Sequence, residues 1–306
     1  MQTFKEAPEI SLPTIASSSI LVELSMGYWS GRIKDKKAST AVTEDNNADV
    51  GTATVTKKLL AHCEELEAIG RFASRARKVH SEMTMPWSDL GQRLLATAMY
   101  DKYHHTMTEL QAEFYTLRDD FLGVYNWRMA EVQARLGGLY VESDYPTVES
   151  LTNRFRFSIN YLMINPESND HRIELGEEAL GIVRDSNRTY YQRQFEGAMN
   201  DVWVRTHKAL KRMSEKLTVN GVGVTHNRHG APLFRDSLVD NLIEMVDMLE
   251  LCNVSGDSQM ANMRLQLDEA LRGVTADGLR TSANLRAETK TAVDEALASL
   301  PTLDLF

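Results

Sequence analysis

Two long stretches of the chain carry apolar residues at alternating spacings of four and three, which predicts amphipathic helices that pack in the manner of a coiled coil. The first predicts a helix over about residues 52–82, and the second a helix over about residues 89–135 that starts after Ser88 and stops at Gly137-Gly138. The short link 83–87 between them favours an antiparallel hairpin. The two seams are Val55, Leu59, His62, Leu66, Ile69, Ala73, Ala76 and His80, and Ala96, Tyr100, Tyr103, Met107, Leu110, Phe114, Leu117, Phe121 and Val124.

Two shorter segments alternate between apolar and polar residues instead, which predicts half-buried strands. They are residues 20–29 and 154–163, and we expect them to pair in one small sheet, with Val222-Gly223-Val224 as a candidate third strand. A further helix fits about residues 172–217, with breaks permitted at its glycines, and the pattern after Pro232 is helical again. The sequence therefore predicts a mainly α protein with a small β-sheet, an α+β fold with long antiparallel coiled-coil-like helices.

Three domains follow from this order of elements. We expect residues 1–50 to hold the first strand and a basic turn, residues 51–165 the helical hairpin and the second strand, and residues 166–306 a helical region with acidic C-terminal helices. The chain has 306 residues, of which 42% are hydrophobic and 25% are charged, so it can bury a sizeable core.

Several classes of location are disfavoured by the composition. The longest aliphatic run, Ile20-Leu21-Val22, is far too short to cross a bilayer, and the first residues lack the basic-then-apolar layout of a secretory signal. Two cysteines, Cys63 and Cys252, suit a reducing compartment. We therefore expect a cytoplasmic protein that does not engage a membrane.

The distribution of charge along the chain indicates where a nucleic-acid surface could lie. The formal net charge is -9, and residues 236–306 hold 13 acidic and 5 basic side chains, so a nucleic-acid surface would have to lie earlier. One basic cluster follows the first strand and another, of Arg71, Arg75, Arg77 and Lys78, decorates the first helix. The candidate site for a partner or a nucleic acid comprises Tyr28, Trp29, Arg32, Lys34, Lys36 and Lys37. Aromatic side chains beside cations can stack bases and hold phosphates, whereas the alternative is a solvated basic rim.

Motifs of catalysis and of cofactor binding are missing from the sequence. The segment Gly221–His226 lacks the third glycine of a dinucleotide fingerprint, and His226 and His229, with His207 upstream, lack the further ligands of a metal site. Cys63 follows His62 directly, and adjacent helical residues point about 100° apart, which favours a small interface residue over a nucleophile. We expect no catalytic residues, no metal and no cofactor.

Three segments, 24–40, 71–103 and 135–162, carry rarer residues in a fixed order: a Trp-Ser-Gly-Arg turn with a lysine cluster, a Pro-Trp before a long helix, and Gly-Gly-Leu followed by Asp-Tyr-Pro. In these motifs the chain resembles, over roughly residues 20–165, a family of tailed-phage proteins of unknown function. Genes of that family are often found near a MoxR-type AAA+ ATPase and a von Willebrand factor A-like protein, which implies a shared pathway. The family has no established functional residues that could be carried over.

These observations lead to three hypotheses. The first is a non-catalytic helical phage adaptor or scaffold in the host cytoplasm that acts with the AAA+ ATPase, self-associates, or does both. The second is a phage protein that binds single-stranded nucleic acid through the basic and aromatic turn at residues 28–37. The third is a structural protein of the virion.

Overall fold

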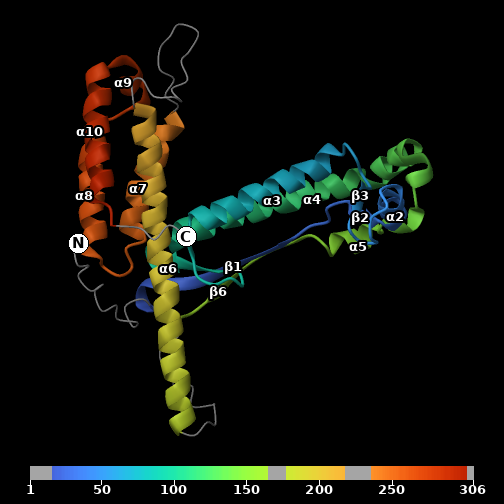
Figure 1. The fold of residues 1–306 in the computed structure, drawn as a ribbon, viewed down its shortest axis with the longest axis horizontal. Coiled ribbons are helices and arrows are strands. Elements are labelled where there is room, and N and C mark those ends of the chain that lie inside the picture. The colour runs from blue at the N-terminus through green and yellow to red at the C-terminus, as the bar shows by residue number, and fades with distance from the viewer. Residues whose placement is uncertain (1–15, 165–176, 218–235, 302–306) are drawn as a thin grey trace. The chain divides into compact units, whose positions relative to one another are not determined.

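A computed structural model describes residues 16–164, 177–217 and 236–301 of the chain (Figure 1). The chain divides into two compact units, each built from separate segments. We call residues 23–82 and 102–160 the hairpin unit, and residues 1–22, 83–101 and 161–306 the bundle unit. The three contiguous domains expected from the sequence stay a prediction.

Two long helices form the hairpin unit, α3 (Glu64–Glu82) and α4 (Tyr100–Leu136), and they lie side by side in Figure 1. Residues near the end of α3 contact residues near the start of α4, and residues near the start of α3 contact residues near the end of α4. The His80 Nδ1 atom lies 2.7 Å from the Tyr103 hydroxyl, the Phe72 and Phe114 rings are 5.9 Å apart, and Arg128 lies 2.9 Å from Glu65. The two helices are therefore antiparallel.

Both helices begin later than the sequence pattern predicts. Residues 52–63 are not helical: Val55–Lys58 is a strand, and the His62 backbone has a φ of 65°, outside the right-handed helical region. Residues 89–99 are not an α-helix either, because Gly91, at a φ of 96°, turns the chain into a strand over 92–96. Ser88 caps no helix; its backbone N–H donates to the carbonyl of Gln92 in that turn.

The predicted seams are partly confirmed by burial. In α3 the seam positions from Leu66 to His80 are buried, and in α4 the buried positions are Tyr103, Met107, Leu110, Phe114, Phe121, Tyr125 and Val132. Burial thus moves from the expected Val124 to its neighbour Tyr125. The coiled-coil character of the pair stays a prediction.

The two predicted strands are confirmed and are neighbours in one sheet. Four strands have the order β4-β5-β1-β6, so β1 lies between β5 and β6. The candidate third strand at residues 222–224 lies outside the described residues. The bounds are Ser19–Gly27 for β1, Met85–Pro86 for β4, Gln92–Ala96 for β5 and Arg156–Leu162 for β6.

A second, two-stranded sheet carries the basic turn of the hairpin unit. Strand β2 (Arg32–Asp35) pairs antiparallel with β3 (Val55–Lys58), and helix α2 (Lys36–Asp45) lies between them in the chain. After α4 come two 3₁₀ turns, η2 (Gly137–Leu139) and η3 (Glu142–Asp144), and helix α5 (Val148–Thr152). The Tyr145 hydroxyl donates to the carbonyl of Leu59 at 3.0 Å, which fixes this segment to the end of β3.

The bundle unit is built from α6 (Glu177–Leu217), α7 (Asp236–Leu251), α8 (Ser258–Leu271), α9 (Ala276–Thr281) and α10 (Ala283–Ser299). Helix α6 packs on α7 and α10, and α8 packs on the same two helices (Figure 1). Asp257, Thr275 and Ser282 start α8, α9 and α10, because each side chain accepts a hydrogen bond from a backbone N–H of the first turn. Helix α6 runs through Gly181 and Gly197 without the breaks that these residues would permit.

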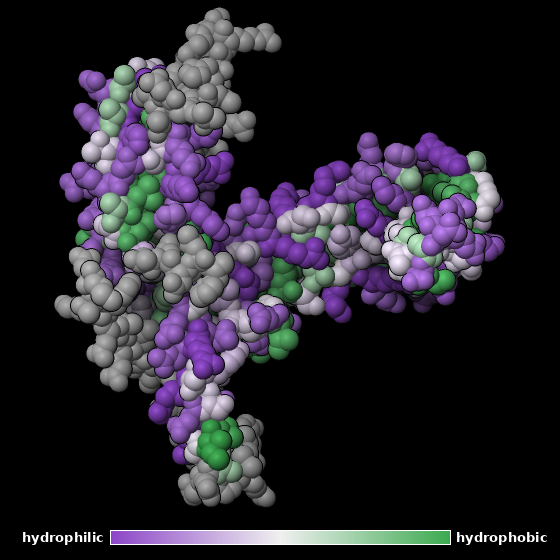
Figure 2. Space-filling model, in the orientation of Figure 1, coloured by the Kyte–Doolittle hydropathy of each residue, from purple (hydrophilic) through white to green (hydrophobic). Residues whose placement is uncertain are grey.

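The structure confirms an α+β fold with a helical majority and small antiparallel sheets. Hydrophilic side chains cover most of the face seen in Figure 2, and hydrophobic residues gather there in small separate groups. Within the described ranges, no helix combines the length and the apolar character that a membrane span needs.

Candidate functional site

The two aromatic residues of the basic turn have different surroundings. Trp29 is buried, with 7% of its surface exposed, and its ring lies 6.1 Å from Phe121 and 5.8 Å from Tyr125 in an edge-on contact. Tyr28 is half-buried and reaches the surface. The burial of Trp29 removes one of the two rings that could stack on a base, so this residue is a core anchor of the hairpin unit.

The four cations of the turn are all exposed but lie on different elements. Arg32 and Lys34 are two apart on β2 and so share one face of the strand. Lys36 and Lys37 are the first residues of α2, whose N-cap is Asp35: its carboxylate accepts a hydrogen bond from the Ala38 N–H at 3.0 Å. Of these four, only Arg32 lines the pocket described next.

A pocket of about 550 Å³ opens between the basic turn, the end of β3 and the first half of α3. It combines cations, hydroxyl groups and a small apolar floor. Its lining residues are Tyr28, Ser30, Gly31, Arg32, Lys58, Leu60, Ala61, His62, Leu66, Glu67, Gly70, Arg71 and Ser74. The structure therefore joins parts of both basic clusters, which the sequence presents as separate.

The pairing of β2 with β3 places two of these cations opposite each other. Arg32 and Lys58 are direct partners in the register, and like charges at such positions are unfavourable. Among the described residues, no carboxylate lies within ion-pair distance of either side chain. Arg71 has a 3.8 Å contact with Glu67, and both side chains are mostly exposed, so this ion pair is weak.

The floor of the pocket requires a glycine at position 31. Gly31 has a φ of 63°, and a Cβ atom there would lie 2.7 Å from the Leu66 Cδ2 atom. A larger residue would be strained in its backbone and would push Leu66 out of place. The carbonyl of Gly31 also accepts a hydrogen bond from the Leu59 N–H at 2.7 Å, which holds the turn against the end of β3.

The rest of the second basic cluster lies outside the pocket. Arg75 stacks over the Phe72 ring at 5.1 Å and forms an ion pair with Glu113, which ties α3 to α4. Lys78 lies 3.5 Å from Glu82 on the same helix. Arg75 and Lys78 therefore belong to a solvated helix face and not to a ligand-binding cluster.

Neither cysteine has the surroundings of a nucleophile. Burial raises the pKa of the Cys63 thiol, which also donates a hydrogen bond to Glu65 at 3.3 Å, and burial raises the pKa of Cys252 to about 11. A thiolate is the reactive form, and a raised pKa reduces its population. Cys63 is buried at the start of α3, as expected of a small interface residue.

A polar cluster links α6 to α10 in the bundle unit. The Ser214 hydroxyl donates to Asp294 at 2.5 Å, and the Lys290 ammonium lies 2.6 Å from Asp294 and 3.3 Å from the Ser214 oxygen. In a Ser–Lys pair that acts as nucleophile and base the lysine takes the serine proton, whereas here the Ser214 hydroxyl donates to Asp294. Hydrogen bonds from Lys290 and Ser214 lower the pKa of Asp294. The cluster therefore stabilises the packing of α6 against α10.

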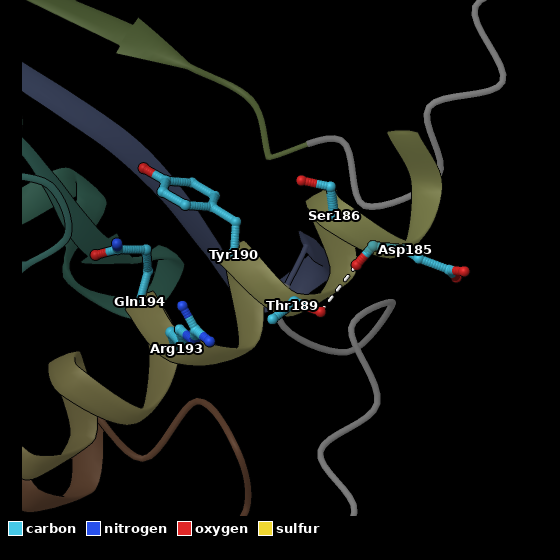
Figure 3. A pocket seen from close by; sticks show the side chains of 6 residues that line it. All are labelled: Asp185, Ser186, Thr189, Tyr190, Arg193 and Gln194. Carbon is cyan, nitrogen blue, oxygen red and sulfur yellow. Dashed lines mark hydrogen bonds between the residues drawn. The ribbon is translucent and has the colours of Figure 1, made fainter. Parts of the chain in front are cut away.

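Another pocket, of about 520 Å³, is lined by one helix alone among the described residues. Figure 3 shows its six side chains, Asp185, Ser186, Thr189, Tyr190, Arg193 and Gln194, which all project from α6. The Thr189 hydroxyl donates to the carbonyl of Asp185 within that helix. Nearby, Ile182 is 67% exposed, and Figure 2 shows a hydrophobic group near the start of α6. Among the described residues, no second element contributes a donor or acceptor to this pocket.

The helix α4 has an exposed tryptophan, Trp127, that the sequence pattern does not indicate. Trp127 is 62% exposed, although the other three tryptophans of the chain are buried. Its neighbours on the helix surface are Gly123 one turn before and Ala130 one turn after. A Cβ atom on Gly123 would meet nothing within 4 Å, so no packing within the described chain requires a glycine there. The Arg128 guanidinium lies over one side of the Trp127 ring, 4.7 Å from its centroid, and the rest of the ring is exposed. We call Gly123, Trp127 and Ala130 the Trp127 face: an exposed aromatic ring between two positions that have small or no side chains.

Sequence reasoning missed Lys58, His62 and Ser74 as pocket residues. The spacing of residues 55–58 suits a short strand as well as a helix, because in a strand Val55 and Lys57 lie on one face and Thr56 and Lys58 on the other. Reading this stretch as a strand would have indicated Lys58 as a candidate. The metal ligands considered at His226 and His229 lie outside the described residues. Among the residues with assigned positions, no three His, Cys, Asp or Glu side chains gather as a metal site would require.

Comparison with known proteins gives one match. The chain matches the family described as "Protein of unknown function (DUF3150)" over residues 17–246, which covers both strands β1 and β6 and the long helices α3, α4 and α6. No curated protein and no solved structure matches the chain significantly. The match spans most of the chain, and the protein therefore belongs to the DUF3150 family.

Proposed function

We propose that this protein is a non-catalytic helical adaptor or scaffold of phage origin that acts in the host cytoplasm with a MoxR-type AAA+ ATPase. The resemblance of residues 20–165 to tailed-phage proteins encoded near such an ATPase suggests the partner. The long antiparallel helices of the hairpin unit supply a stiff support on which a binding face can be presented.

The observation that carries this proposal is the Trp127 face. Tryptophan is highly buried on average, and it is enriched among the residues that dominate the energy of protein interfaces. A glycine inside a helix costs about 1 kcal/mol relative to alanine. Gly123 is exposed, and no neighbour in the described chain requires a glycine there. A partner that packs closely against α4 at this point would explain why the chain has a glycine despite its cost in helix stability.

The test is co-purification of the full chain with the AAA+ ATPase of the same genome, with and without ATP. We expect a complex whose amount depends on the nucleotide and that Trp127→Ala weakens by about tenfold or more. Gly123→Leu should weaken it as well, because the larger side chain would hold a partner helix away from α4.

A matched control is Tyr100→Ala, which removes another exposed aromatic side chain, 37% exposed, at the start of α4 and away from the Trp127 face. It should leave the complex intact. Absence of any complex, or a complex that neither Trp127→Ala nor Gly123→Leu affects, would contradict the proposal.

A further inference from the structure

The pocket beside the basic turn has a net positive charge in an acidic protein. Its cations Arg32, Lys58 and Arg71 come from three different elements, and Glu67 is the single acid that lines it among the described residues. The side chains thus carry a balance of two positive charges, while the whole chain carries -9. An anionic ligand would relieve the repulsion between Arg32 and Lys58, which face each other across the strand pair.

The arrangement of donors favours phosphate over carboxylate. A planar carboxylate is satisfied by one guanidinium in a two-point contact, whereas a phosphate presents three oxygens and at neutral pH carries a charge between about -1.5 and -2. Here two guanidinium groups and an ammonium line the pocket from β2, β3 and α3, together with the Tyr28 hydroxyl. The Ser74 hydroxyl also lines it, but it donates to the carbonyl of Gly70 at 3.2 Å. The negative charge of a phosphate monoester is therefore about equal in size to the net positive charge of the pocket side chains.

The size and floor of the pocket point to a small molecule. A volume of about 550 Å³ lies within the range of small-ligand sites, and Leu60, Ala61 and Leu66 supply apolar surface beside the cations. Trp29, which could have helped a strand of nucleic acid to stack, is in the core. We propose that this pocket binds a phosphate group carried by a small molecule of about the size of a mononucleotide.

The proposal is tested by isothermal titration of the full chain at about 50 mM salt, where the attraction between charges is only partly screened. The probes are AMP, adenosine, inorganic phosphate and a single-stranded oligothymidylate. We expect AMP to bind with a Kd below about 1 mM and adenosine to bind at least tenfold more weakly. Phosphate that binds as tightly as AMP would also support the site and would identify free phosphate as its ligand.

Substitutions assign the binding to this pocket. Arg71→Gln and Lys58→Gln should each weaken AMP binding by about tenfold or more. Lys78→Gln, on the same helix as Arg71 but outside the pocket, should leave it unchanged. None of the three variants should melt below the unmodified chain, because these side chains are exposed and Lys58→Gln also removes the repulsion with Arg32.

Three results would overturn the proposal: no binding of AMP or phosphate, AMP binding that survives both substitutions, or binding of the oligothymidylate alone. The last result would favour the nucleic-acid hypothesis instead. None of them affects the adaptor proposal, which depends on the Trp127 face.

Discussion

Replacement of Trp29 by alanine should destabilise the protein strongly. A tryptophan buries roughly 150–250 Å², which at about 25 cal/mol per Å² corresponds to about 4–6 kcal/mol, part of which alanine retains. Trp29 is 7% exposed and contacts both Phe121 and Tyr125, so nearly all of this burial is lost. We expect the free energy of unfolding to fall by about 3–5 kcal/mol.

The assay is thermal unfolding followed by circular dichroism at the helical band. For a chain of 306 residues the expected loss lowers the Tm by roughly 5–8 °C. Trp29→Phe keeps a ring against Phe121 and should recover part of the difference. The matched control is Trp127→Ala, which removes an exposed ring and its contact with Arg128, and should lower the free energy of unfolding by no more than about 1 kcal/mol.

A Trp29→Ala variant that melts within about 2 °C of the unmodified chain would contradict the burial of this ring. That result would mean that the ring is solvated, as the nucleic-acid hypothesis requires. A large loss of stability in Trp127→Ala would equally contradict the assignment of the two tryptophans to core and surface.

Three further results are expected. Gly123→Ala should raise the free energy of unfolding by up to about 1 kcal/mol in urea unfolding, since alanine is the better helix former and a Cβ atom there meets open space; a loss of stability would show hidden packing. Cys63 and Cys252 should react with Ellman's reagent at pH 8 only after denaturant is added, because burial raises the pKa of both thiols, and rapid reaction of the folded chain would contradict their burial. Since the pKa of Asp294 is lowered in the folded state, its contribution is present above the unfolded pKa of about 4 and lost as pH falls through the lower folded value. The stability difference between the unmodified chain and Asp294→Asn, measured by urea unfolding, should therefore shrink below pH 4, and a constant difference would exclude this linkage.

The sequence predicts the helical hairpin and the strands β1 and β6 because their patterns are long. Alternation over nine residues in β1 and the seam of α4 from Tyr103 to Phe121 each fit one structure only. Short apolar runs fit a helix as well as a strand, and the pattern therefore predicts helix over 55–62 and 92–96, although both stretches contain strands. At Gly91 and His62 the left-handed backbone ends the local pattern, and spacing alone does not reveal it.

The candidate site was less accessible to sequence reasoning, because contacts between distant segments create it. The side chain of Trp29 contacts Phe121 and Tyr125, about ninety residues further along the chain, so its burial cannot be inferred from its neighbours in the turn. Arg32 and Arg71 line the same pocket only because β3 pairs with β2 and leads into α3.

The alternation of segments between the two units affects how the protein can be synthesised and cut. Residues 83–101 belong with the bundle unit but lie between the two halves of the hairpin unit, so the growing chain crosses between the units more than once. On the ribosome, the hairpin unit cannot complete its packing before β6 emerges, and the β4-β5 pair must wait for α6, where Arg205 donates to the carbonyl of Thr84. For the same reason, no single cut of the gene yields either unit as a continuous fragment.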